Sequence, residues 1–203
     1  MIKIEKNKIA LVGFPEAIFI KDMINQIPQD QYDISVICPD DFFNLIKSKH
    51  DGYMICVTRD MQLRARLVEH FVQQDLPGFS FVHPSAVIFP DVVVGGGCFV
   101  GPFAFIASQA QVEDHCLINP YVMVSHRCTI SQGSILQPGA MIAGSTKIGR
   151  YCKLNFKSAT LDDISIANFT EVGANSLVTK TIEEEHGVYV GTPARRVKHN
   201  TPE

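Results

Sequence analysis

Apolar residues in the first part of the chain fall into short runs that alternate between strand-like and helix-like spacing. The continuous apolar run KIALVGF at 8–14 is typical of a parallel strand buried on both faces. Further strands are predicted at 33–38, 52–57 and 79–82, and helices at 15–27, 40–47 and 59–73. This alternation predicts a small Rossmann-like α/β domain with a parallel sheet, which we place at residues 1–82.

The spacing changes at Ala86, after which an aliphatic residue recurs at every sixth position. Stepping by six from Ile88 to Val178 gives sixteen positions, of which all but Thr160 are aliphatic. The residue two places earlier is small in nearly every hexad, and side chains two apart share one face of a strand. Both positions therefore point inward, and the period predicts a left-handed parallel β-helix of triangular section over residues 83–203.

One outward position in each hexad lies between the two inward ones, and sorting these residues by coil separates three faces of the prism. The first face is apolar, the second mostly polar, and the third changes from apolar to charged. The first face consists of Val87, Phe105, Met123, Met141, Ala159 and Leu177. The second consists of Val93, Gln111, Thr129, Lys147 and Ser165. The third consists of Phe99, Leu117, Ile135, Lys153 and Glu171. An apolar stripe is rarely left in water. We expect self-association through the first face as a closed trimer, the alternative being cover by the α/β domain or the tail.

The composition argues against several classes of function. Lys and Arg total 18 against 21 Asp and Glu without a basic run, so we expect neither nucleic acid nor an anionic membrane as partner. No segment approaches the roughly 18 apolar residues of a membrane span, and no secretory signal precedes the first strand. The six cysteines form no CxxC pair, and Cys98, Cys116, Cys128 and Cys152 occupy inward positions. They predict reduced packing thiols, without a metal site, in a cytoplasmic protein.

Several segments together resemble a known family. They are the α/β unit, VHPSA at 82–86, the unbroken hexads, SHRC at 125–128 and GVYVGTPARRV at 187–197. Over essentially its whole length the chain resembles the nucleotide-sugar N-acetyltransferases of the bacillosamine, perosamine and sialic-acid pathways, within the hexapeptide-repeat acyltransferases. The resemblance implies a homotrimer in polysaccharide biosynthesis that transfers an acetyl group from acetyl-CoA to the amine of a nucleotide-linked deoxyamino sugar.

The same resemblance places the catalytic histidine at His126, at a prism corner beside the apolar face. An imidazole there can accept a proton from the sugar amine as it attacks the thioester, worth ~10²–10⁴ in rate; the alternative is a surface histidine without a role. Gly144 lies one coil later, and the resemblance implies that its N–H faces the thioester oxygen. Further implied contacts to coenzyme A are Asn119, Phe156, Ala174 and Pro193.

For the nucleotide sugar, the resemblance implies contacts from Asp40, Asp41, Arg59 and Arg64 in the α/β domain. The first loop departs from the family pattern, because Glu16, Ala17 and Ile18 stand where a glycine-rich loop binds phosphates through backbone N–H groups. Glu16 would repel a diphosphate, whereas Arg59 can contact a phosphate directly. The pocket is therefore expected to recognise the family's nucleotides, a different nucleotide, or none.

The β-helix also departs from the pattern close to the histidine. The family usually has an acidic residue after its catalytic histidine, where this chain has Arg127, a cation that disfavours the protonated imidazole. Glu113 or Asp114 from the preceding coil are candidates to supply the carboxylate instead. A second family histidine near the cofactor is Ile135 here.

Three rival functions stay open. An O-acetyltransferase or longer-chain acyltransferase would use the same scaffold, with a carboxylate assisting His126. A zinc carbonic anhydrase would need three histidines around one metal, but His115 and His126 stand eleven positions apart and His83 lies at the prism entrance. A catalytically decayed binding or scaffold protein would account for Arg127 and the lost glycines.

Overall fold

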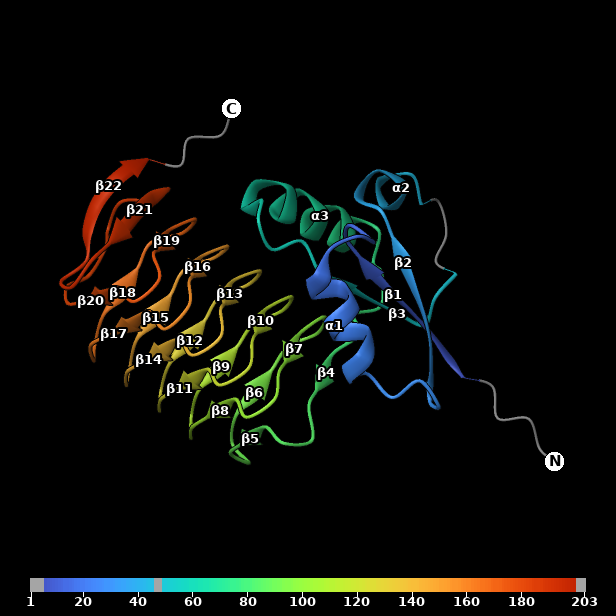
Figure 1. The fold of residues 1–203 in the computed structure, drawn as a ribbon, viewed down its shortest axis with the longest axis horizontal. Coiled ribbons are helices and arrows are strands. Elements are labelled where there is room, and N and C mark those ends of the chain that lie inside the picture. Colours follow the sequence, from blue (N-terminus) through green and yellow to red (C-terminus); the bar gives the residue numbers. More distant parts are fainter. Residues whose placement is uncertain (1–5, 46–48, 200–203) are drawn as a thin grey trace.

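The computed structural model describes residues 6–45 and 49–199 as an α/β domain followed by a triangular β-helix (Figure 1). The α/β domain consists of β1 (Asn7–Val12), α1 (Ile18–Gln26), β2 (Tyr32–Ile37), α2 (Pro39–Phe43), β3 (Gly52–Ile55) and α3 (Met61–Gln73). Its strands are parallel in the order β2–β1–β3. The predicted parallel sheet is thus confirmed, with three strands.

The strand predicted at 79–82 belongs to the β-helix and not to the α/β sheet. β4 (Phe81–Val82) pairs with β7 (Phe99–Val100), and the segment touches β3 through an isolated bridge between Gly78 and Tyr53. Phe79 and Phe81 are buried in the cluster where the two domains meet. A short apolar run indicates a buried strand without indicating which sheet it joins.

Three parallel sheets form the walls of the β-helix, and each coil contributes one two-residue strand to each wall. The covered wall contains β4, β7, β10 (Leu117–Ile118), β13 (Ile135–Leu136), β16 (Lys153–Leu154) and β19 (Glu171–Val172), and ends in β21 (Gly187–Val190) and β22 (Arg195–His199). The apolar wall contains β5 (Val87–Ile88), β8 (Phe105–Ile106), β11 (Met123–Val124), β14 (Met141–Ile142), β17 (Ala159–Thr160) and β20 (Leu177–Val178). The polar wall contains β6 (Val93–Val94), β9 (Gln111–Val112), β12 (Thr129–Ile130), β15 (Lys147–Ile148) and β18 (Ser165–Ile166).

The inward positions of the hexads fill the prism as predicted. The aliphatic residues and the small residues two places before them form one continuous buried cluster. Cys98, Cys116, Cys128 and Cys152 are at most 1% exposed within it, and all six cysteines of the chain are free. Thr160, the exception among the aliphatic positions, accepts a hydrogen bond of 3.0 Å from the backbone N–H of Ala143, which satisfies its buried hydroxyl.

The α/β domain packs against the covered wall and leaves the apolar wall open. Outward residues of the first coils, such as Leu117 and Ile135, are fully buried against α1 and the α/β sheet, which lie beside β7 and β10 in Figure 1. On the apolar wall, by contrast, Val87, Met123 and Met141 are 38–52% exposed. The alternative to self-association, cover of the apolar face by the α/β domain, is therefore excluded, because that domain covers the third face instead. None of the described helices is both long and apolar enough to cross a membrane.

Candidate active site

His126 lies on the corner between the apolar and polar walls, in a column of residues spaced by one coil. We call residues 125–127, 143–145 and 161–163 the His126 corner. Its coils are joined by hydrogen bonds from Ser145 N–H to the His126 carbonyl (2.9 Å) and from Asp163 N–H to the Gly144 carbonyl (3.0 Å). The exposed imidazole lies directly over Gly144, since a Cβ there would stand 2.5 Å from the ring Cε1. Glycine at residue 144 therefore provides the space that the imidazole occupies.

Asp162 is the third member of this column and was not identified from the sequence. Its Oδ1 accepts a hydrogen bond of 2.7 Å from the Gly144 N–H. The N–H that the resemblance assigned to the thioester oxygen is thus already bonded to a carboxylate, and in this arrangement it is not a free oxyanion donor. The signal that could have found Asp162 is the 18-residue coil period, which leads from His126 through Gly144 to Asp162.

The carboxylates expected to assist His126 are in a different place. Glu113 and Asp114 lie on the corner between the polar and covered walls, which we call the His115 corner (113–115, 131–133, 149–151 and 167–169). There they accept backbone hydrogen bonds from Gln132 (2.9 Å) and Gly96 (2.7 Å). The suggestion that either could pair with His126 is wrong, because the polar wall separates the two corners.

Arg127 remains close to His126 as the sequence indicated. Its Nε donates a hydrogen bond of 3.1 Å to the Ser145 hydroxyl on the next coil. The guanidinium is therefore held along the His126 corner and adds a positive charge there.

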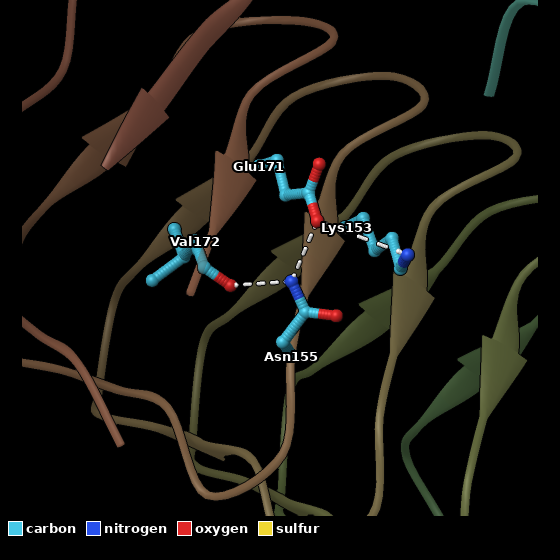
Figure 2. A network of polar contacts seen from close by, with 4 residues as sticks. All are labelled: Lys153, Asn155, Glu171 and Val172. Carbon is cyan, nitrogen blue, oxygen red and sulfur yellow. Dashed lines mark hydrogen bonds and ion pairs between the residues drawn. The ribbon is translucent and has the colours of Figure 1, made fainter. Parts of the chain in front are cut away.

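Asn119 and Phe156 lie on the corner between the covered and apolar walls, which we call the Asn119 corner (119–121, 137–139, 155–157 and 173–175). Asn119 is only 2% exposed, and its Nδ2 donates to the Leu136 carbonyl at 3.0 Å. Figure 2 shows the equivalent amide two coils later, Asn155, donating to the Val172 carbonyl (3.0 Å) and to Glu171 (2.9 Å). The buried Asn119 and the partly buried Asn155 thus join neighbouring coils at the corner where the exposed Phe156 ring lies.

The C-terminal loop joins the same corner. Thr192 Oγ1 donates to the Asn175 carbonyl (3.2 Å), and the Asn175 N–H donates to the Phe156 carbonyl (2.9 Å). Pro193 and Ala174 are thereby held near Phe156. Four residues proposed to contact coenzyme A thus share the Asn119 corner, whereas Gly144 and His126 lie across the apolar wall. A single protomer does not bring these two groups together.

A cavity of about 470 Å³ opens at the carboxyl edge of the α/β sheet. It lies where the chain leaves β1 and β3 in opposite directions, which is the usual ligand crevice of open parallel sheets. Glu16 and Arg59 both line it, together with residues 17–19 and the end of β3. Asp40 and Asp41 are exposed in the first turn of α2 and are not among its lining residues.

A second cavity of about 280 Å³ lies between α1 and the Asn119 corner. Asn119 and Phe156 line it from the β-helix, and Gln26 from α1. The Gln26 Oε1 is buried without a hydrogen-bond partner among the described residues. Phe19 lines both cavities, so the two cavities are neighbours along α1, one at the edge of the α/β sheet and the other at the Asn119 corner.

Arg64 does not line either cavity, and the prediction that it contacts substrate is wrong. It is fully buried, and its guanidinium donates to the carbonyls of Ile55 (2.7 Å), Val57 (3.0 Å) and Gly133 (2.8 Å), and to that of His115. All three guanidinium nitrogens thus donate to main-chain carbonyls. Arg64 therefore fastens α3 to the β-helix.

Neither His115 nor the buried thiols of Cys56 and Cys152 carry a charge at neutral pH. His115 is buried on its own corner, where burial and Arg64 lower its pKa to about 4. Burial raises the pKa of the Cys56 and Cys152 thiols to about 12, so these thiols stay protonated. Within residues 6–45 and 49–199, no three His, Cys, Asp or Glu side chains gather as a metal site.

Comparison with known proteins relates this chain to acyltransferases. No family model matches. A 52-residue segment is 48% identical to UDP-3-O-acylglucosamine N-acyltransferase 2 of Sulfurimonas denitrificans, but this match spans 26% of the present chain and only 16% of that protein.

Solved structures extend the similarity to nearly the whole chain. PerB from Caulobacter crescentus, in complex with CoA and GDP-perosamine, matches with a TM-score of 0.84 and 20% identity, over 96% of this chain and 98% of that one. The acetyltransferase domain of PglB from Neisseria gonorrhoeae FA1090, in complex with acetyl coenzyme A, matches with a TM-score of 0.82 and 17% identity, over 95% and 100%. This chain therefore has the two-domain fold of these N-acetyltransferases.

Proposed function

We propose that this protein is an acetyl-CoA-dependent N-acetyltransferase that acts on the amine of a nucleotide-linked deoxyamino sugar. The fold that it shares with PerB and the PglB domain, which bind CoA, GDP-perosamine or acetyl-CoA, supports this class of reaction. The exposed His126 beside Gly144 supports a general base at the prism corner.

The observation that carries the proposal is the position of the two residue groups on opposite edges of the exposed apolar wall. In a homotrimer packed through that wall, His126 of one protomer would face the Asn119 corner of its neighbour. Burial of Met123 and Met141 would stabilise the assembly, at roughly 25 cal/mol for each Å² of apolar surface removed from water. The trimer would thus complete the site.

In this proposal the substrate would occupy the two neighbouring cavities beside that site. The nucleotide would occupy the 470 Å³ cavity with Arg59 as its cationic contact, and the amino sugar would follow α1 toward the 280 Å³ cavity. Acetyl-CoA would lie along the Asn119 corner, where Phe156, Ala174 and Pro193 are exposed. The amine would then approach the thioester from the side of the partner's imidazole.

In the reaction, the amine nitrogen attacks the thioester carbonyl carbon and the carbon–sulfur bond breaks. His126 takes the proton that the amine loses, and this proton is returned to the departing coenzyme A thiolate. General-base assistance of this kind contributes about 10²–10⁴ in rate. The products are the N-acetylated sugar and free coenzyme A.

The test is acetyl transfer from acetyl-CoA to amino sugars carried on UDP, GDP, dTDP and CMP, preceded by a thermal-shift screen of the same compounds. We expect one nucleotide class to raise the melting temperature and to be acetylated. His126→Ala should lower kcat at least ~10²-fold with an unchanged oligomer mass, whereas His83→Ala, at the prism entrance, should stay active. Full activity in His126→Ala would overturn the assignment.

A second candidate, O-acetylation of a sugar hydroxyl, is favoured by one observation. A hydroxyl needs stronger base assistance than an amine, and the Asp162 carboxylate lies in the same column as His126. Replacing the acceptor amine by a hydroxyl in the same assay separates the two reactions.

The cytoplasmic location of the protein also stays a prediction.

A further inference from the structure

We propose that Asp162 is a positioning residue that offsets the positive charge gained by the His126 imidazole in the reaction, an inference that rests on the proposed function. Both groups converge on Gly144: a Cβ at that residue would be 2.9 Å from His126 Nε2 and 3.0 Å from Asp162 Oδ1. Nε2 and Oδ1 are therefore at most about 6 Å apart, within the range over which opposite charges stabilise each other.

The carboxylate is fixed in this place by the backbone. Its Oδ1 accepts the Gly144 N–H at 2.7 Å, and the coil beneath it is held by the hydrogen bond from Asp163 N–H to the Gly144 carbonyl. The absence of a side chain at Gly144 leaves the imidazole and the carboxylate on the same open surface of the corner. Only the glycine at residue 144, which has no side chain, separates Asp162 from His126 in the column.

The other charges around His126 cannot take this role. Arg127, on the same turn, adds positive charge and is bonded to Ser145. On the preceding coil, Ser108 occupies the column and donates to Asp91 at 2.5 Å, which engages that carboxylate. Among the described residues of the column, Asp162 is therefore the carboxylate that faces the imidazole through Gly144.

The charge balance of the proposed reaction gives Asp162 its function. When His126 takes the proton from the attacking amine it becomes an imidazolium, next to the cation of Arg127. The Asp162 carboxylate offsets this gain in positive charge and transfers no proton itself. Closure of the site by a neighbouring protomer would exclude water and strengthen this interaction.

The experiment compares Asp162→Asn, which keeps an oxygen acceptor for the Gly144 N–H and removes the charge, with Asp163→Asn, the adjacent exposed carboxylate. For Asp162→Asn we expect kcat to fall about tenfold, with unchanged KM for both substrates and an unchanged melting temperature. Asp162→Glu should restore part of the rate, and Asp163→Asn should match the wild type.

A second readout needs no turnover. At one fixed pH, the NMR chemical shifts of the His126 ring should differ between Asp162→Asn and the wild type, whereas Asp163→Asn should leave them unchanged. Absence of acetyl transfer in the wild type would defeat the proposed function and leave this comparison as an independent test. Unchanged His126 chemical shifts and an unchanged kcat in Asp162→Asn, or a faster Asp162→Ala variant, would overturn the inference, since the carboxylate would then only occupy the Gly144 N–H.

Discussion

The Nε of Arg64 on α3 donates a 2.8 Å hydrogen bond to the carbonyl oxygen of Gly133 in the β-helix. The same guanidinium donates to Ile55 and Val57 at the end of β3, so one side chain joins the carboxyl end of the α/β sheet to the His115 corner. The α/β domain and the β-helix are thus connected by polar as well as apolar contacts, and the cavity edge at β3 is fixed relative to the prism.

Replacing Arg64 by Met should destabilise the protein without weakening nucleotide binding to the folded form. The substitution leaves buried carbonyl groups without donors, which costs about 3 kcal/mol or more in the free energy of unfolding. Urea denaturation measures the loss, and calorimetry below the transition measures the binding. Unchanged stability together with lost nucleotide binding would show that Arg64 contacts the substrate and would contradict its structural role.

The stability of the fold should decrease as the pH falls from 6.5 toward 4. His115 has a pKa lowered to about 4 in the folded protein, whereas 6.5 is its ordinary value. The unfolded chain therefore binds more protons in this window, and stability must rise with pH there, by up to about 3 kcal/mol. His115→Asn, which tolerates the positive φ of 59° at this residue, should show a shallower pH dependence in urea titrations. An equal slope in both proteins would contradict the assignment.

A charge on the apolar wall should break the proposed trimer. In Met141→Glu a carboxylate would have to be buried without a partner, so we expect dissociation in analytical ultracentrifugation. The matched control is Gln111→Glu, on the exposed polar wall, which should keep the wild-type mass. A wild-type protein that sediments as a monomer at assay concentrations would rule out this interface.

The two opposite charges of the larger cavity should have opposite effects on nucleotide affinity. Glu16 and Arg59 both line it, so Arg59→Gln should weaken binding of a nucleoside diphosphate sugar and Glu16→Gln should strengthen it, each by about tenfold at low salt. Calorimetry measures both, with Asp40→Asn as the control outside the cavity lining. Identical affinities in all four proteins would place the nucleotide elsewhere.

The coil period predicted the β-helix well, because a six-residue repeat fixes which side chains point inward and which residues stack. It placed His126 and Gly144 in one column and, followed one step further, leads to Asp162. A repeat cannot show which hydrogen-bond partner each polar atom has. The bond between the Gly144 N–H and Asp162 depends on a side-chain rotamer and not on the spacing.

Other features could not be predicted from the hydrophobic pattern, because they depend on contacts between the two domains. Leu117 and Met123 are equally apolar in the sequence, yet one is covered by the α/β domain and the other is exposed. The sequence did not indicate that Arg64 is buried, because arginine is rarely buried unless it is paired. The smaller cavity likewise arises from how α1 lies against the Asn119 corner.

The claim that the site is shared between protomers is tested most directly by mixing two inactive variants. His126→Ala removes the base, and Ala174→Trp would block the Asn119 corner. After unfolding and refolding together in equal amounts, hybrid trimers would each contain one intact site, which predicts recovery of about one quarter of wild-type acetyl transfer. Hybrid trimers that form, as shown by mass, and yet remain inactive would contradict the account.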